Sequence, residues 1–239
     1  MGRAHEVRAK AMAATAAARS ALFMRASKEI YMAAKSGEPD PEMNLALRSA
    51  IEKWKGQNVT KEVIERAIQK AKGGSAESYS AGRYEGFAQG QSAIIVDTLT
   101  DNTNRAYVNV RGAFTKKGGH LGTPGSVSFN FNECGVIEFE GTNRDEVEEN
   151  LIMADVDVNS VELDEDFITV TTAPTALNQA KEALNAMGIT EFTTCEIKML
   201  PNELVELDPE DEEKFKGLLG MLSECEDVQA VYHNVKLHD

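Results

Sequence analysis

Residues 135–200 decide the fold of this chain, and they read GVIEFEGTNRDEVEENLIMADVDVNSVELDEDFITVTTAPTALNQAKEALNAMGITEFTTCEIKML. Short apolar runs alternate here with stretches of helical spacing, as in Val147 and Leu151, which lie one helical turn apart. The pattern predicts, in order, a strand, a helix, two strands joined by an acidic turn, a helix and a strand. These elements span 136–139, 145–153, 160–163, 167–172, 174–187 and 192–200. The order β-α-β-β-α-β is the ferredoxin-like signature.

The first 75 residues predict a small helical domain with an extended N-terminal tail. Apolar side chains repeat at helical spacing over 22–34, 43–54 and 63–71. Asp40 followed by Pro41 predicts the start of the second helix, since aspartate caps helices and proline fits their first turn. Met43 is then expected to face the core. The run Gly-Gly-Ser at 73–75 predicts a linker.

The middle of the chain changes to a mixed pattern. Residues 92–100 predict a strand, Asp101 predicts the cap of a helix that ends at Gly118, and the alternation over 126–131 predicts a half-buried strand. These elements are too few for a second layered domain. A C-terminal helix over 209–222 and a strand over 228–232 would complete it. We therefore expect an α+β protein with three domains, at 1–75, at 76–133 plus 202–239 (a discontinuous α/β middle domain), and at 134–201 (the inserted ferredoxin-like domain).

The charge is distributed unevenly along the chain. The net charge is −14, yet residues 1–72 hold 14 Lys+Arg against 8 Asp+Glu, whereas residues 134–239 hold 6 against 26. Such asymmetry suggests a polyanionic partner for the basic part. The alternative is that acidic faces keep the protein in solution, and both can hold at once.

A glycine-rich loop over 118–125 follows Lys116 and Lys117. It is not a phosphate-binding P-loop, because that motif follows a strand and opens a helix. Backbone amides could still form a small anion-binding nest beside the two lysines. The alternative is an ordinary helix end followed by a turn.

Catalysis and metal binding are not expected. The three cysteines are far apart, form no CxxC pair and are odd in number, which favours a reducing compartment and argues against zinc. No Ser-His-Asp or Cys-His arrangement has a recognisable context. We expect a cytoplasmic, non-enzymatic protein without cofactor, metal, export signal or membrane span. The sequence does not predict an oligomeric state.

Specific motifs are spread along the chain from its first helical segment to its C-terminal strand. Residues 83–131 read RYEGFAQGQSAIIVDTLTDNTNRAYVNVRGAFTKKGGHLGTPGSVSFNF, residues 227–235 read DVQAVYHNV, and residues 28–44 read KEIYMAAKSGEPDPEMN. In combination they closely resemble the YebC/PmpR family, nearest to its YeeN-like branch. One departure is the segment AHEVRAKAMAATAAARSALF at 4–23, where many relatives carry an SKW-type opening and a lysine-rich first helix. Its lower basic density weakens the expectation of a strong DNA contact there.

The resemblance implies three domains and a role as a probable DNA-binding transcriptional regulator. The family also includes the mitochondrial translational activator of cytochrome c oxidase. That relationship implies an alternative: a translation factor that binds rRNA or tRNA on the ribosome and eases synthesis of proline-rich stretches.

Cationic and amide side chains in two regions are the candidate nucleic-acid contacts. We expect them to bind phosphates rather than base edges, since no recognition helix is evident. The alternative for Arg105 is an ion pair with Asp101 on its own helix, at i and i+4. The candidate residues are Arg3, Arg8, Lys10, Arg19, Arg25, Lys28, Asn102, Asn104, Arg105, Arg111, Lys116 and Lys117.

Overall fold

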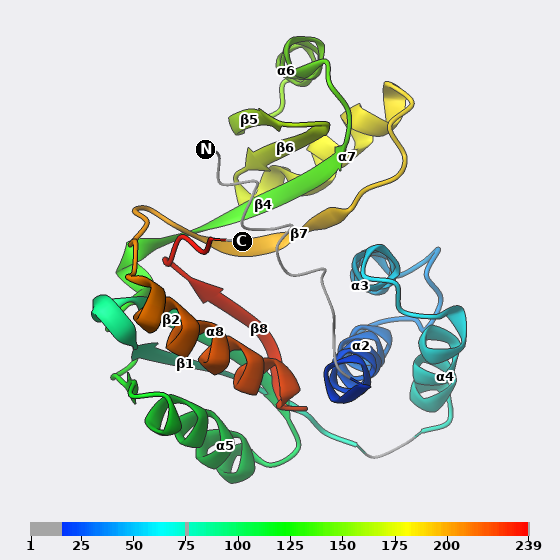
Figure 1. Cartoon of the computed structure of the whole chain (residues 1–239). Coiled ribbons are helices and arrows are strands. Elements are labelled where there is room, and N and C mark those ends of the chain that lie inside the picture. The colour runs from blue at the N-terminus through cyan, green and yellow to red at the C-terminus, as the bar shows by residue number, and fades with distance from the viewer. Residues whose placement is uncertain (1–15, 75–76, 239) are drawn as a thin grey trace. The chain divides into compact units, whose positions relative to one another are not determined.

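The structure, a computed structural model, describes residues 16–74 and 77–238. It is an α+β protein with N-terminal helices, as the sequence predicts, and it contains two four-stranded sheets (Figure 1). The chain divides into two compact units: Glu133–Met199 makes up most of one, and most of the remaining described residues make up the other. None of the described helices is long and apolar enough to cross a membrane.

The unit around Glu133–Met199 has the predicted ferredoxin-like topology. Its sheet has the order β5-β6-β4-β7, and β6 pairs antiparallel with both β4 and β5. Buried Ile137, Leu151, Val170 and Leu184 show that strands and helices share one core. The elements are β4 (Phe131–Glu140), α6 (Arg144–Met153), β5 (Val158–Asp164), β6 (Phe167–Thr172), α7 (Leu177–Ala186) and β7 (Thr194–Pro201).

Three helices precede the first sheet, namely α2 (Ala16–Lys35), α3 (Leu45–Gly56) and α4 (Lys61–Lys72). They enclose a core that includes Tyr31 and Trp54. The predicted start of α3 was wrong. The side chain of Asn44 caps the helix by accepting from the Leu47 amide at 3.0 Å, while Asp40 accepts from the Glu42 amide in the preceding turn. Met43 therefore precedes the helix and is 75% exposed.

The second sheet has the order β3-β1-β2-β8 and lies in the other unit. Helices α5 and α8 pack on it and share a core that includes Ile94, Phe114 and Phe215 (Figure 1). Strand β8 pairs with β2, so a C-terminal strand completes a sheet whose other strands lie before residue 122. The exact domain boundaries stay a prediction. The elements are β1 (Ser80–Phe87), β2 (Ala93–Thr100), α5 (Thr103–Lys116), β3 (His120–Leu121), α8 (Pro209–Glu224) and β8 (Val228–His233).

Two local predictions in this region were wrong, and β1 was missed. Residues 126–131 do not form a strand: Ser128–Asn130 is a short 3-10 helix and Phe129 is 71% exposed. The cap of α5 is Asn102, not Asp101. The sequence of β1, SAGRYEGF, contains two glycines, which are uncommon inside strands, so its pattern does not predict a strand. Gly86 is nevertheless required, because an added Cβ would lie 2.6 Å from the Phe114 ring and 2.8 Å from the His120 carbonyl.

Candidate nucleic-acid interface

Helix α5 presents the least acidic stretch of the chain. From Asn102 to Asn132 the sequence contains no Asp or Glu, although the whole chain has 39 of them. The side chain of Asn102 accepts from the Arg105 amide at 3.0 Å and so begins the helix. Ala106, Val110, Ala113 and Phe114 are buried, so most other side chains of α5 face outward. The cations of this stretch are therefore not balanced by acids on their own segment.

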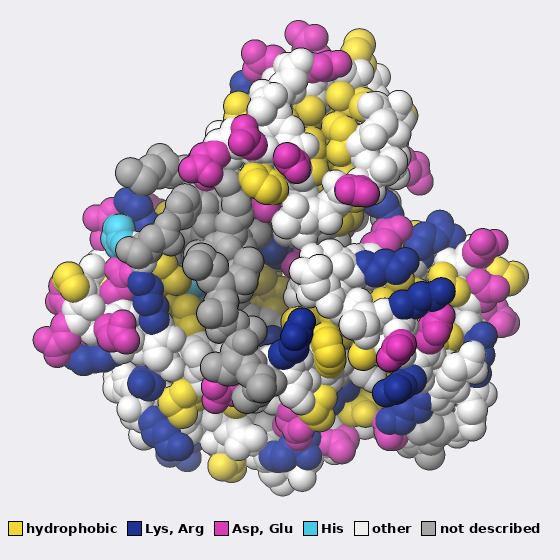
Figure 2. Space-filling view, turned by 45° about the vertical axis from the view of Figure 1, so that its right-hand side comes forward, with side chains coloured by type: hydrophobic (Ala, Val, Ile, Leu, Met, Phe, Trp, Pro, Cys, Tyr) yellow, Lys and Arg dark blue, Asp and Glu magenta, His cyan; other side chains and the backbone are white. Residues whose placement is uncertain are grey.

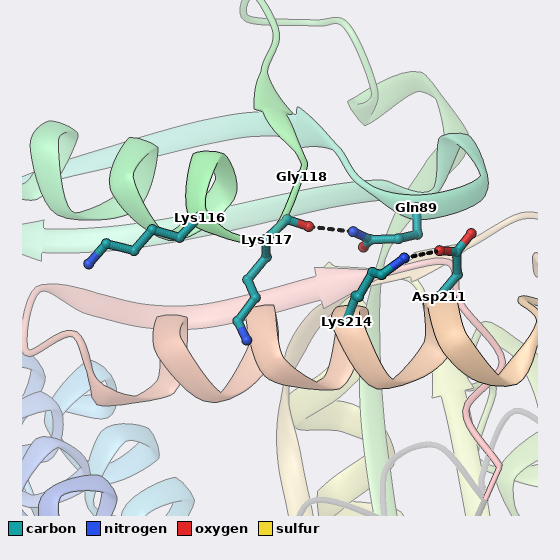
Figure 3. Close-up of a pocket in the computed structure, with 6 residues that line it drawn as sticks. All are labelled: Gln89, Lys116, Lys117, Gly118, Asp211 and Lys214. Carbon is teal, nitrogen blue, oxygen red and sulfur yellow. Dashed lines mark hydrogen bonds and ion pairs between the residues drawn. The ribbon is translucent and has the colours of Figure 1, made fainter.

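The C-terminus of α5 places its last two lysines at an open groove. The helix ends where Gly118 adopts a φ of +78°, a conformation that favours glycine, and the Gly119 amide donates to the Phe114 carbonyl at 2.9 Å. Lys117 extends toward α8, whereas Lys116 points away along α5 (Figure 3). The two lysines thus point in different directions from one helix end.

The groove encloses about 570 Å³ and draws on three elements. Its lining residues are Gln89, Lys116, Lys117, Gly118, Asp211 and Lys214. The Gln89 side chain donates to the Lys117 carbonyl, while its own carbonyl oxygen is buried without a hydrogen-bond partner among the described residues (Figure 3). The Lys214 ammonium pairs with Glu210 at 2.9 Å and Asp211 at 3.3 Å. Lys214 is therefore largely neutralised, and the free positive charge at this groove comes from α5.

The tip of the glycine-rich loop is organised by a buried carboxylate. Glu85 accepts hydrogen bonds from the backbone amides of Gly125 at 2.8 Å, Val127 at 2.7 Å and Ser128 at 2.9 Å. Burial raises the pKa of Glu85, but the hydrogen bonds from these amides outweigh it and hold the pKa below its ordinary value.

Two further loop amides are also engaged within the protein. The Gly118 amide donates to the Thr115 carbonyl, and the Gly122 amide donates to the Glu85 carbonyl. These amides are not available as an anion nest, so the helix end and turn is the better description.

Arg105 belongs to an ion network around a buried acid. Its guanidinium donates to the Asp227 carboxylate at 2.9 and 2.7 Å and to Asp101 at 2.7 Å, which includes the expected i and i+4 pair. These hydrogen bonds, that to Asp227 foremost, raise the pKa of Arg105. Lys28 from α2 reaches the same Asp227 at 3.1 Å and is itself buried. Both cations are thus held by protein carboxylates.

The other candidates fall into separate places. Arg25 is partly buried and donates to the Ser223 carbonyl, and its burial lowers its pKa. Arg19 is exposed. Asn104, Arg111 and Lys116 are exposed on α5. Arg3, Arg8 and Lys10 lie outside the described residues. The structure therefore brings Asn102, Asn104, Arg105, Arg111, Lys116 and Lys117 onto one helix and its ends, and it assigns Lys28 and Arg25 to contacts between α2 and the α8–β8 region.

Two polar residues of the groove and one exposed aromatic were missed from the sequence. Lys214 follows a run of four acidic residues, so its own positive charge does not stand out in the sequence. The signal for its role is its i+4 spacing from Glu210, which predicts an ion pair on one helix face. Gln89 lies in the turn between β1 and β2, where the sequence carries no signal. Tyr107 is 43% exposed on α5.

On the face shown in Figure 2, acidic side chains are frequent over the Glu133–Met199 unit, which agrees with the acidic composition of that part.

Comparison with known proteins covers both units. The model of the TACO1/YebC protein N-terminal domain matches residues 3–74, and that of the TACO1/YebC second and third domain matches residues 79–235. The chain is 50% identical over 239 residues to probable transcriptional regulatory protein Mfl546 of Mesoplasma florum, covering 99% of this chain and 100% of that protein. It is 50% identical over 218 residues to probable transcriptional regulatory protein YeeN of Escherichia coli K12, covering 91% of this chain and 92% of that one.

A solved structure shares the fold. The crystal structure of the conserved hypothetical protein Aq1575 of Aquifex aeolicus superimposes with a TM-score of 0.80 at 36% identity, covering 97% of this chain and 94% of that one. The family models match both the helical and the α/β parts, and the named relatives are called probable transcriptional regulatory proteins. The chain therefore belongs to the TACO1/YebC family.

Proposed function

We propose that this protein is a non-enzymatic, cytoplasmic regulator of gene expression that binds nucleic acid through phosphate contacts. The contacts come from the α5 surface, which we define as Arg111, Lys116 and Lys117. One observation carries the proposal: these cations lie in a run of residues, 102–132, that has no acid, within a chain of net charge −14. None of the three has an ion-pair partner within the part of the chain that the structure describes.

Phosphate is the ligand that this arrangement suits. Arg111 and Lys116 are exposed and Lys117 is half-buried. Unpaired lysine and arginine side chains keep their full charge for a polyanion, and they release its condensed counterions on binding. Arg105 and Lys28 lack this freedom because Asp227 holds both, so they support the surface rather than form it. Since the named relatives are probable transcriptional regulators, duplex DNA is the first ligand to test.

The N-terminal cations are a second part of the proposal. Residues 1–72 carry a net positive charge, and Arg19 on α2 is exposed. Arg19, together with Arg3, Arg8 and Lys10, would add phosphate contacts of the same sequence-independent kind.

The decisive experiment removes two charges from the α5 surface. Binding to two duplexes of unrelated sequence is measured by fluorescence anisotropy over a series of salt concentrations. The double variant Lys116→Ala/Lys117→Ala should weaken both duplexes equally and flatten the log–log salt slope by about 0.9 for each phosphate that the protein no longer neutralises. Arg66→Ala/Lys72→Ala is the matched control, since it removes from α4 two exposed cations to which the proposal gives no contact. Equal affinity and salt slope in the α5 double variant and the wild type would refute the proposal.

A further inference from the structure

The outermost face of α5 carries side chains beside Arg111 that the phosphate contacts alone do not use. Asn104, Val108, Arg111 and Thr115 follow one another at spacings of three and four residues, so they form one stripe opposite the buried face. All four are exposed. Tyr107 borders this stripe and precedes Arg111 by four residues, one helical turn.

Tyr107 is positioned but not covered. Its ring lies against that of Tyr84 from β1, with centroids 6.1 Å apart and planes at 45°, and Tyr84 packs at the margin of the core. The Tyr107 side chain is nevertheless 43% exposed, and the neighbouring Val108 is 64% exposed. A ring supported in this way has few rotamers left to lose when a ligand stacks on it.

The polar neighbours of Tyr107 are free. Neither the Asn104 amide nor the Arg111 guanidinium forms a side-chain hydrogen bond or ion pair within residues 16–74 and 77–238. An aromatic ring, an amide with both donor and acceptor, and a guanidinium therefore lie unpaired on consecutive turns of one helix. A base offers a π face, a hydrogen-bonding edge and an adjoining phosphate, which match these three groups in turn.

We propose that Tyr107 stacks an unpaired nucleobase, with Asn104 at the base edge and Arg111 at the neighbouring phosphate, so that the protein prefers single-stranded segments of nucleic acid. This inference rests on the proposed function and specifies its ligand. In a duplex both faces of each base are already stacked on neighbouring bases, so the Tyr107 ring cannot add stacking energy to duplex binding. A protein partner fits less well, because Tyr107 and Val108 offer far less apolar area than the roughly 800 Å² a side of a stable protein interface.

The test compares single strands with a duplex. Affinities for oligouridine, oligothymidine and a duplex of equal length are measured by anisotropy for the wild type, Tyr107→Leu and Tyr107→Phe. Tyr107→Leu should weaken single-strand binding by about 5- to 150-fold, the equivalent of 1–3 kcal/mol for one stacked base, and leave duplex binding unchanged. Tyr107→Phe should keep the wild-type affinity because it keeps the ring. Val108→Ala removes an exposed apolar side chain from the same face and should have no effect.

A second measurement needs no variant. An oligonucleotide that contains iodouracil is irradiated in complex with the wild-type protein, and a stacked base should cross-link to Tyr107, as mapped by mass spectrometry. The oligouridine and oligothymidine arms show whether the 2′-hydroxyl of RNA adds affinity. An unchanged ratio of single-strand to duplex affinity in Tyr107→Leu, with no adduct at Tyr107, would overturn base stacking and leave the proposed function standing. A wild-type protein that binds neither form would overturn both.

Discussion

The guanidinium of Arg105 binds the carboxylate of Asp227 with two hydrogen bonds, 2.9 Å from Nε to Oδ2 and 2.7 Å from Nη2 to Oδ1. Bidentate, charge-assisted pairs of this kind are among the strong hydrogen bonds of proteins. Asp227 is 1% exposed, and Lys28 reaches it from α2 at 3.1 Å. One buried acid thus connects α2, the start of α5 and the residue that precedes β8.

Replacement of Arg105 by alanine should destabilise the protein by about 1–3 kcal/mol. The buried Asp227 carboxylate would lose both hydrogen bonds from Arg105, and only Lys28 would still balance its charge. Arg105→Lys should cost less, since lysine can restore one of them. Urea denaturation followed by circular dichroism measures the change.

Arg111→Ala is the control for this prediction. Arg111 lies on the same helix but is exposed and outside any ion pair among the described residues, so its loss should change the free energy of unfolding by no more than about 0.5 kcal/mol. Under our proposal it should instead weaken nucleic-acid binding. If Arg105→Ala proved as stable as Arg111→Ala, the ion network would not contribute to folding.

Glu85→Gln should loosen the glycine-rich loop. The lowered pKa of Glu85 means that its contribution to stability is present above the ordinary glutamate pKa of 4.5 and is lost as the pH falls through the lower folded value. The variant should therefore be less stable than the wild type at pH 7 but lose less stability below pH 4.5. Hydrogen exchange should show faster exchange at the amides of Gly125, Val127 and Ser128, its three partners. Unchanged protection of these amides would show that the carboxylate does not hold the loop.

A second acid-sensitive contact ties the C-terminal segment to α8. The Lys216 ammonium at 2.9 Å, and then the imidazole and backbone amide of His238, lower the pKa of Glu212 to about 2. This stabilisation is present above pH 4.5 and disappears between 4.5 and about 2 as the pH falls. The free energy of unfolding of Glu212→Gln should accordingly fall less than that of the wild type as the pH drops below 4.5. Glu213→Gln, the exposed neighbour, should reproduce the wild-type curve.

Two glycines of α8 should respond differently to alanine. Alanine in a helix is favoured over glycine by up to about 1 kcal/mol, and at Gly220 the added methyl meets nothing within 4 Å. At Gly217 it would lie 2.6 Å from the Lys117 ammonium and displace it. Gly220→Ala should therefore raise the melting temperature more than Gly217→Ala does. Equal gains would show that the Lys117 side chain has no preferred place over Gly217.

Much of the fold could be predicted because apolar spacing is a local signal. The helix and strand patterns of residues 136–200 are each carried by their own side chains, and they indicate the ferredoxin-like order. Strand β1 was not predicted because Gly86 stands in place of an apolar side chain at the point where the ring of Phe114 approaches. The cap of α3 was predicted at the wrong residue because Asp40 and Asn44 are both good caps, and only packing decides between them.

The candidate site could be predicted only as a set of charges. The sequence shows that Arg105, Arg111 and Lys116 are cations on one helix, and it shows the near pairing of Arg105 with Asp101. It cannot show Asp227, 122 residues away, which accepts from Arg105. Long-range pairing of this kind separates structural from free cations and depends on the tertiary fold.

The pairing of β8 with β2 has a consequence for synthesis of the chain on the ribosome. The Glu133–Met199 unit lies between these strands in the sequence, so its residues have all been made before β8 emerges. Until then β2 offers an unpaired edge, and the Arg105 side chain has no Asp227 to bind. A chain that terminates early, before Asp227, would keep the intact inserted unit but carry an open sheet edge, and such edges attract aggregation and proteolysis. Only a polypeptide that has been made through β8 can cover the β2 edge and supply Asp227 to Arg105, so loss of the segment from Asp227 onward should leave this sheet unfinished while the inserted unit keeps all of its own strands.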